Sequence, residues 1–372
     1  MQWNELYGHE RQKHWFATAL ANGRLATSFL FVGPEGIGKR TFARLLAKGL
    51  LCRQSEPRSL EACGKCEDCV QVDALTHPDL LTIAKPEDKA FIPIDLLIGE
   101  RDKRMREGLC HDISMRPYGG RRKIAIIDDA DYFNTEGANC LLKTLEEPPT
   151  NSLLILLGTS LQRQLPTIRS RCQAILFKPL DAEQIQALLL RQGVVDSEQR
   201  AAELARQSAG SLSEARVLID PELDDFRTQL LAALAKPQLP LVELAKSCGA
   251  ITDAAGKETR LKRERLKMIF RFAAAFYREL ALHLSSRPSS SAADSAPTGE
   301  RSAGDTAAKH SAAQPELVAA VIAGGSNWKT GPAGATRAWD RCLLASEQVE
   351  RNANQATVLE AWAADLAQLG GY

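Results

Sequence analysis

Short runs of apolar residues alternate with amphipathic stretches along the first half of the chain. Each run is apolar at nearly every position, which is typical of strands buried on both faces of a parallel sheet. The stretch from about Lys39 to Leu51 follows the first run and has apolar residues at helical spacing instead. We therefore predict an α/β domain whose parallel sheet is covered by helices on both faces. The four predicted strands cover Ser28–Val32, Lys123–Ile127, Leu153–Leu157 and Ala174–Phe177.

Helical spacing of apolar residues replaces these runs in the second half of the chain. Residues 181–235 are rich in Leu, Ala, Gln, Glu and Arg and contain no strand-like run. Pro237 and Pro240 mark a boundary, and two further helical stretches cover 241–284 and 315–368. We predict three domains: an α/β domain over 1–178, a small helical domain over 179–237 and a C-terminal helical domain over 238–372.

Residues 285–314 lie between the last two helical stretches and contain no Leu, Ile, Val or aromatic residue. They are mostly Ser, Ala, Gly, Pro and Thr with scattered charges. A segment of this composition buries too little apolar surface to offset the entropy lost when it is ordered. We predict a disordered insertion within the C-terminal helical domain.

Charge and hydropathy exclude several classes of protein. The 372 residues carry 47 basic and 46 acidic side chains, a net charge of +1, so the chain is neither polybasic nor polyacidic. No stretch approaches the roughly 18 consecutive apolar residues that indicate a transmembrane helix. The N-terminal residues lack the apolar core of a signal peptide. We therefore expect a cytoplasmic protein that does not contact the membrane.

A glycine-rich segment follows the first predicted strand and opens the helical stretch. It runs Gly33-Pro34-Glu35-Gly36-Ile37-Gly38-Lys39-Arg40-Thr41, the spacing of a phosphate-binding loop, in which backbone N–H groups cradle phosphates and the lysine reaches the outer ones. The motif has Ser or Thr directly after the lysine to hold Mg²⁺. This chain has Arg40 there, and Thr41 follows one position, about 100° of helix, too late. We predict that this loop binds a nucleotide, with ATP as the candidate, and does not hydrolyse it efficiently. The candidate residues are Gly33, Gly36, Gly38, Lys39 and Thr41.

Two aspartates follow the second predicted strand. Asp128 comes after four apolar residues, where a Walker B aspartate holds the metal ion. The next residue in such a motif is normally the Glu that positions the attacking water. Here it is Asp129, whose shorter side chain matters because a displacement of about 1 Å can cost about 10²-fold in rate. Both are candidate nucleotide-site residues. The alternative, that acidic residues cap the next helix, applies mainly to Asp131.

Four of the nine cysteines form a cluster. Three have C-x2-C-x2-C spacing and the fourth ends the helix after the phosphate loop. Four thiolates make a closed tetrahedral zinc site with no position left for catalysis. An iron–sulfur cluster is one competing interpretation, but its spacing requires a cysteine where this chain has Asp73. The other competing interpretation is that the cysteines bind no metal. The predicted ligands of a structural Zn²⁺ are Cys52, Cys63, Cys66 and Cys69, and we expect the isolated Cys110, Cys140, Cys172, Cys248 and Cys342 to be bystander thiols.

Two further strings complete a pattern that extends over residues 29–172. Asn139–Pro149 reads NCLLKTLEEPP, and Arg169-Ser170-Arg171-Cys172 ends in SRC. Together with the phosphate loop and the inserted cysteines, they resemble the clamp-loader subunits of the bacterial replicative DNA polymerase, DNA polymerase III, a family of the AAA+ class. Beyond residue 180 the resemblance is limited to helical character and the string Gly210-Ser211-Leu212.

The resemblance implies a fold and a setting. The expected fold is an AAA+ nucleotide-binding domain with an inserted zinc module, a helical lid, and a helical collar through which five subunits form an open ring. The expected partners are the other clamp-loader subunits (the τ/γ ATPase and δ), the sliding clamp, and primed DNA through the complex. The implied function is ATP-dependent loading of the sliding clamp onto primed DNA in chromosomal replication, as part of the polymerase holoenzyme.

The family contains motor subunits of the τ/γ kind, which hydrolyse ATP, and a non-motor δ′ kind, which supplies an arginine finger to a neighbour. Three positions of this chain depart from the motor pattern: Arg40, Asp129, and Ser213 where a lid arginine is expected. The SRC arginine, Arg171, is intact. The resemblance therefore implies a stator in which Arg171 acts in trans.

Two other interpretations stay open. An active τ/γ-type ATPase would use Lys39 and Asp128 with an unusual metal shell. A zinc-containing nucleic-acid-binding module would need basic or aromatic residues around the cysteines, and Glu61–Val70 holds one Lys, three acidic residues and no aromatic residue, so it ranks last.

Overall fold

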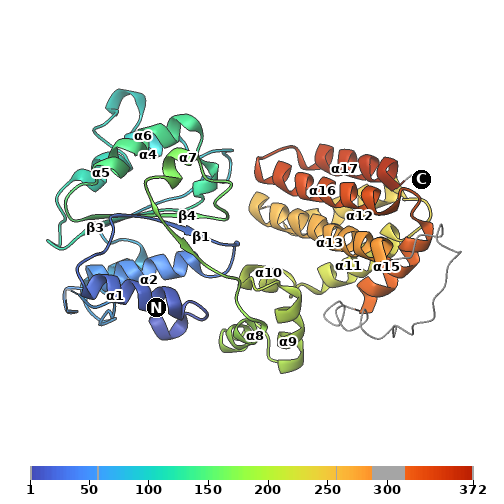
Figure 1. The fold of residues 1–372 in the computed structure, drawn as a ribbon, viewed down its shortest axis with the longest axis horizontal. Helices are drawn as coiled ribbons and strands as arrows, with labels where there is room; N and C mark the ends of the chain where they lie inside the picture. Colours follow the sequence, from blue (N-terminus) through green and yellow to red (C-terminus); the bar gives the residue numbers. More distant parts are fainter. Residues whose placement is uncertain (1, 57, 257, 287–314, 371–372) are drawn as a thin grey trace, which may run out of the picture. The chain divides into compact units, whose positions relative to one another are not determined.

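The computed structural model describes residues 2–56, 58–256, 258–286 and 315–370. The chain divides into two compact units, Met1–Arg216 and Val217–Tyr372. The first runs from blue to green in Figure 1 and the second from green to red. Each unit has its own apolar core.

A five-stranded sheet forms the centre of the first unit. Its strand order is β2-β3-β4-β1-β5, and every pairing is parallel. The fold class predicted from the sequence, an α/β domain built on a parallel sheet, is confirmed. The strands are β1 (Ser28–Val32), β2 (Leu80–Ile83), β3 (Lys123–Ile127), β4 (Ser152–Gly158) and β5 (Gln173–Leu176).

Helices cover both faces of this sheet (Figure 1). Alternate residues of β1 enter different cores, because successive side chains of a strand point to opposite faces. Phe29 and Phe31 pack on the side of α1 and α2, whereas Leu30 and Val32 pack on the side of α4, α5 and α6. The helices of this layered part are α1 (Glu10–Ala21), α2 (Lys39–Leu51), α3 (Glu67–Ala74), α4 (Ile94–Ile98), α5 (Leu109–Ser114), α6 (Thr135–Glu146) and α7 (Pro166–Arg169), with single 3₁₀ turns η1 (Trp3–Glu5), η2 (Arg101–Lys103) and η3 (Ala130–Tyr132).

Three short helices follow the sheet, α8 (Ala182–Arg191), α9 (Glu198–Gln207) and α10 (Leu212–Val217). A capping box at Asp181 and Gln184 starts α8, and the Ser197 hydroxyl caps α9. Apolar side chains of α8 and α9, including Ile185, Leu189 and Leu204, are buried. These helices lie where the sequence predicts the helical lid, and their residues up to Arg216 belong to the same compact unit as the sheet.

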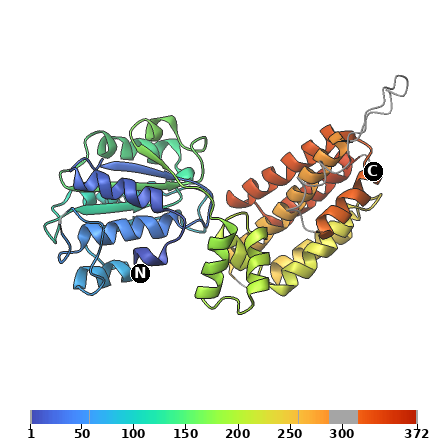
Figure 2. The same ribbon diagram turned by 60° about the horizontal axis from the view of Figure 1, so that its bottom comes forward.

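The second unit is entirely helical in its described part. Helices α13, α16 and α17 lie side by side in both views (Figures 1 and 2). Its core centres on Phe270, Phe276, Tyr277 and Trp362. The helices are α11 (Pro221–Leu234), α12 (Leu241–Asp253), α13 (Thr259–Ser286), α15 (Pro315–Asn327), α16 (Gly331–Glu350) and α17 (Gln355–Gly370).

The division between the units differs from the boundary predicted at 237/238. Helix α11, which the sequence assigns to the small helical domain, buries Leu230, Leu231 and Leu234 in the core of the C-terminal unit. The burial of these leucines, rather than the prolines at 237 and 240, decides where α11 belongs.

Most of the predicted insertion 285–314 lies outside the described residues. Its first two residues, Ser285 and Ser286, are the last turn of α13. Among the helices of the described chain, none combines the length and apolarity needed to cross a membrane.

Candidate functional site

The phosphate loop joins the end of β1 to the start of α2, as the sequence predicts. Gly38 immediately precedes α2 with φ +102°, and Gly36 has φ +72°. Both values lie in the left-handed region that favours glycine. A Cβ on Gly33 would lie 2.3 Å from the Phe177 carbonyl oxygen. The three candidate glycines therefore allow a tight loop that no larger residue would form in the same way.

Lys39 opens α2 and turns back over the loop. Its side chain is almost fully buried, and Nζ donates to the carbonyl oxygens of Gly33 and Pro34, each at 2.5 Å. Burial lowers the pKa of this ammonium group, and the neighbouring carboxylates of Glu35 and Asp128 oppose that shift. The lysine therefore lies where it can reach phosphate oxygens held by the loop.

Arg40 extends from the first turn of α2 to the end of β3. Its Nε and Nη2 both donate to Oδ2 of Asp128. The other oxygen of Asp128, Oδ1, accepts from the backbone N–H of Asp129 at 3.0 Å. Thus Arg40 and Asp128, the two residues that the sequence analysis places at the hydroxyl and Walker B positions, form an ion pair with each other. Thr41, the next residue of α2, is half-buried.

Asp129 has a left-handed backbone, with φ +57° and ψ +36°. Burial, with the adjacent charge of Asp128 as the second cause, raises the pKa of its carboxyl group to about 6. A carboxylate in this position is costly at neutral pH, because it is partly desolvated beside a like charge.

Asp131 does not act mainly as the helix cap considered from the sequence. Its Oδ2 accepts from the backbone N–H of Thr159 at 2.8 Å and from the Thr159 hydroxyl at 2.5 Å. The Gln164 amide donates to its other oxygen. Burial raises the pKa of this carboxyl group, and the Thr159 bonds oppose the shift. Asp131 therefore fixes the chain that leaves β4 beside the phosphate loop.

The lid contacts the phosphate loop through backbone and serine side chains. The Leu212 N–H donates to the Gly36 carbonyl oxygen at 3.1 Å. Ser213 stands where the lid arginine was expected and lies against Gly36. The nearby Arg216 donates instead to the Gln192 side chain at 2.6 Å. In this geometry the lid brings hydroxyl groups, rather than a guanidinium, to the loop.

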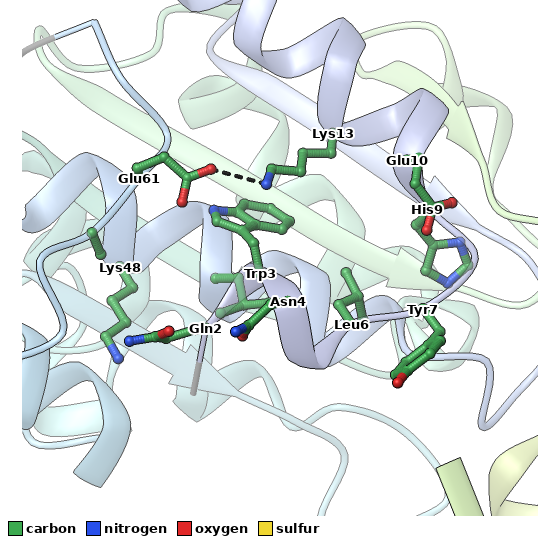
Figure 3. Close-up of a pocket in the computed structure, with 12 residues that line it drawn as sticks. Gln2, Trp3, Asn4, Leu6, Tyr7, His9, Glu10, Lys13, Lys48 and Glu61 are labelled. Atoms are coloured by element: carbon green, nitrogen blue, oxygen red, sulfur yellow. Dashed lines mark ion pairs between the residues drawn. The ribbon is translucent and has the colours of Figure 1, made fainter. Parts of the chain in front are cut away.

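The N-terminal segment also supports the loop, and the sequence analysis did not identify it. His9 is almost fully buried, and its Nε2 lies 2.7 Å from the Ile37 carbonyl oxygen. Burial lowers the pKa of its imidazole. A cavity of about 560 Å³ lies in this region, and Figure 3 shows the ion pair of Lys13 and Glu61 above Trp3 at its edge. The sequence signal for this supporting role was limited to Trp3 and His9 in the N-terminal stretch.

The four clustered cysteines come together at the end of α2 and the start of α3. Their sulfur atoms all lie within 4.8 Å of one another. The Cys52–Cys66 and Cys63–Cys69 sulfur pairs are 3.8 and 3.9 Å apart. A tetrahedral Zn²⁺ with bonds of about 2.3 Å requires sulfur separations of about 3.8 Å. The cluster is therefore compatible with a closed tetrahedral zinc site.

Groups around the cysteines hold the loop in place and favour the thiolate of Cys63, whereas burial raises the pKa of the Cys66 and Cys69 thiols. Backbone N–H groups of Lys65 and Cys66 donate to the Cys63 sulfur and lower its pKa to about 6. Buried Asp68 accepts from Arg53 Nε at 2.9 Å, and this contact lowers the pKa of Asp68 to about 2. Arg121 donates to two carbonyl oxygens of the loop that follows Cys52.

Arg171 follows α7 at the entry to β5. Its Nε donates to Glu146 Oε1 at 2.7 Å, and Nη2 donates to the same oxygen. Its Nη1 donates to the Thr167 carbonyl oxygen and to the Ser170 hydroxyl, at 3.1 and 3.2 Å. The side chain is 32% exposed. The structure thus brings together the LEEPP string, which contains Glu146, and the SRC string, and leaves the guanidinium accessible at the surface of the unit.

Comparisons with known proteins identify similar chains. Residues 8–181 match the family model described as "DNA polymerase III, delta subunit". The chain is 31% identical over 255 residues to DNA polymerase III subunit delta′ of Pseudomonas aeruginosa, which covers 67% of this chain and 70% of that protein. It is 35% identical over 221 residues to DNA polymerase III subunit tau of Escherichia coli, covering 58% of this chain and 32% of that protein. A third similar protein is subunit delta′ of Bacillus subtilis, 32% identical over 176 residues, or 47% of this chain and 49% of that protein. The chain thus spans about a third of the tau subunit.

Proposed function

The chain belongs to the family of DNA polymerase III clamp-loader subunits, and from this premise we propose that it is the non-motor subunit of its complex, of the δ′ kind. In this role it does not hydrolyse ATP at its own phosphate loop. It completes the ATP site of a neighbouring subunit and supports loading of the sliding clamp onto primed DNA.

The observation that carries the proposal is the ion pair between Arg40 and Asp128. Mg²⁺ binds oxygen ligands in near-octahedral geometry, and catalysis of phosphoryl transfer depends on that ion. A guanidinium only donates hydrogen bonds, so Arg40 offers the metal no ligand and adds a positive charge beside Asp128. Mg²⁺ therefore does not fit this site as the residues stand.

Two further features of the same site support a non-motor role. Asp129 replaces the longer Glu, so its carboxylate ends one methylene short of the place from which Glu positions the attacking water, and a displacement of about 1 Å can cost about 10²-fold in rate. Ser213 replaces the lid arginine and lies so close to Gly36 that a Cβ added there would be 2.7 Å from its hydroxyl oxygen. The metal ligand, the water-positioning acid and the lid cation are thus all altered.

Arg171 is the group that we propose acts in trans. A guanidinium aimed at the γ-phosphate of a neighbouring site stabilises the charge that develops there, and such fingers contribute about 10³- to 10⁵-fold in rate in GTPases. Glu146 holds Arg171 through Nε and Nη2, which limits the rotamers of a long side chain. Because the pair is partly exposed, its loss on docking costs about 1 kcal/mol or less.

The remaining parts have supporting roles in this proposal. Cys52, Cys63, Cys66 and Cys69 hold a structural Zn²⁺ that orders the segment between α2 and α3. The C-terminal helical unit serves as the collar that binds the other clamp-loader subunits, τ/γ and δ. The sliding clamp and primed DNA are reached through the assembled complex, in the cytoplasm.

The second candidate is an active ATPase of the τ/γ kind. It is favoured by the 35% identity to a tau subunit and by the presence of Lys39 and Asp128. It requires Arg40 to leave Asp128 so that a metal ion can enter. We rank it second because Arg40 occupies the position of the hydroxyl ligand and is paired with Asp128.

The test uses the complex reconstituted with cognate subunits, the clamp and primed DNA. Arg171→Ala is expected to abolish the contribution of one neighbouring ATP site, a loss of about 10³-fold at that site. Arg169→Ala is the matched control, because Arg169 is an exposed arginine two residues away. Equal ATPase rates in the Arg171→Ala and Arg169→Ala complexes would contradict the arginine-finger role.

A further inference from the structure

The Arg40–Asp128 pair connects two elements that a metal ion usually joins. Arg40 lies in the first turn of α2, after β1, and Asp128 follows β3. In the sheet, β4 lies between β1 and β3, so the guanidinium extends across the carboxyl end of β4. It makes two donor contacts with one oxygen of Asp128.

Arg40 can bind a second anion while it is paired with Asp128. The contacts with Asp128 use Nε and Nη2, and a guanidinium has five N–H donors arranged in a planar fork. The side chain is 61% exposed, so a phosphate can reach its free edge. Arginine also binds phosphate through paired, charge-assisted hydrogen bonds. One guanidinium can therefore join Asp128 on one side to a phosphate on the other.

The neighbouring groups supply the rest of a phosphate site. Lys39 Nζ lies over the loop, within 2.5 Å of two of its carbonyl oxygens, and the first N–H groups of α2 are free of intrahelical partners because they begin the helix. Two cationic side chains and a helix N-terminus can neutralise phosphate charge without a divalent ion. In a phosphate loop that holds Mg²⁺, the metal ion bridges the β- and γ-phosphates and neutralises their charge.

We infer that the Arg40 guanidinium takes the place of the magnesium ion at this loop, so that the loop binds the phosphates of a nucleotide without a divalent cation. The inference rests on the proposal that this loop is not a hydrolytic centre. It is tested on the isolated full chain, so its failure is separate from a failure of the role of Arg171.

The experiment measures equilibrium binding of fluorescent ATP and ADP analogues to the zinc-loaded full chain, in excess Mg²⁺ and in excess magnesium chelator. For the wild-type chain we expect the dissociation constants of both nucleotides to change by less than about twofold between the two conditions. Nucleotide binding that is lost in chelator, or that is at least about tenfold tighter with Mg²⁺, would overturn the inference. Absence of nucleotide binding in both conditions would overturn it as well.

Three variants identify the group responsible. Arg40→Thr restores the hydroxyl and frees Asp128, so its nucleotide binding should become at least about tenfold tighter with Mg²⁺ than with chelator. Arg40→Ala should bind about tenfold more weakly than wild type in both conditions, because it loses charge-assisted bonds. Arg11→Ala, at an exposed position of α1, should behave as wild type. Circular dichroism confirms that each variant is folded, and an Arg40→Thr chain indifferent to Mg²⁺ would contradict the inference.

Discussion

Asp129 gives a prediction about stability whose sign and size follow from its surroundings. The folded chain raises the pKa of this carboxyl group from 3.8 to about 6. In the unfolded chain the group therefore loses its proton at lower pH than in the folded chain. Ionisation of Asp129 thus destabilises the fold as pH rises from about 4 to about 6, and the full cost remains above that range.

Replacing Asp129 with Asn removes this cost. The rise in the pKa of Asp129 from 3.8 to about 6 corresponds to about 3 kcal/mol of stability, because each pKa unit corresponds to about 1.36 kcal/mol. We expect Asp129→Asn to stabilise the first unit by about 1.5 kcal/mol at pH 5 and by about 3 kcal/mol at pH 8. Urea unfolding gives the change for the chain, and hydrogen–deuterium exchange of the β3 amides reports the first unit separately.

The control for this prediction is Asp88→Asn, because Asp88 is a highly exposed carboxylate. Its effect should stay within about 0.5 kcal/mol at both pH values. A stabilisation by Asp129→Asn that is the same at pH 5 and pH 8, or a destabilisation at pH 8, would refute the argument that burial and Asp128 raise the pKa of Asp129.

Two other predictions concern the cysteine cluster and the partner of Arg171. Cys69→Ser removes a buried ligand of the proposed zinc site. Zinc content measured by mass spectrometry should therefore fall from one ion per chain to well below one, and hydrogen exchange in α3 should become faster. Full zinc content in this variant would contradict the four-cysteine site. Glu146→Gln removes the carboxylate that holds Arg171, but this pair is partly exposed, so ATPase of the reconstituted complex should change by less than about fivefold. A loss as large as that of Arg171→Ala would mean that Glu146 has a direct catalytic role.

Features whose residues lie close together in the sequence were predicted well. The all-buried strand β1 and the phosphate loop are continuous segments, and three of the four clustered cysteines lie within seven residues. Strand β2 was missed because it has only four residues, at the edge of the sheet, with Thr82 exposed. Its short run lacks the continuous apolar character of the buried strands.

Features that depend on the folded arrangement were not predicted. Arg40 and Asp128 are 88 residues apart in the sequence. They meet because β1, β4 and β3 are parallel, so that the carboxyl ends of β1 and β3 lie on the same side of the sheet. The sequence indicated that Arg40 could not hold Mg²⁺, but not that it neutralises Asp128. The contact of Glu146 with Arg171 and the support of the loop by His9 are likewise tertiary.

The central claim is that this chain contributes Arg171 to a neighbour and no hydrolysis of its own. The most direct measurement is the clamp- and DNA-stimulated ATPase rate of the complex reconstituted with Lys39→Ala, beside the Arg171→Ala complex. The account predicts a near-wild-type rate for Lys39→Ala and the loss of one site's contribution for Arg171→Ala. A loss with Lys39→Ala as large as that with Arg171→Ala would contradict the claim and favour a motor subunit.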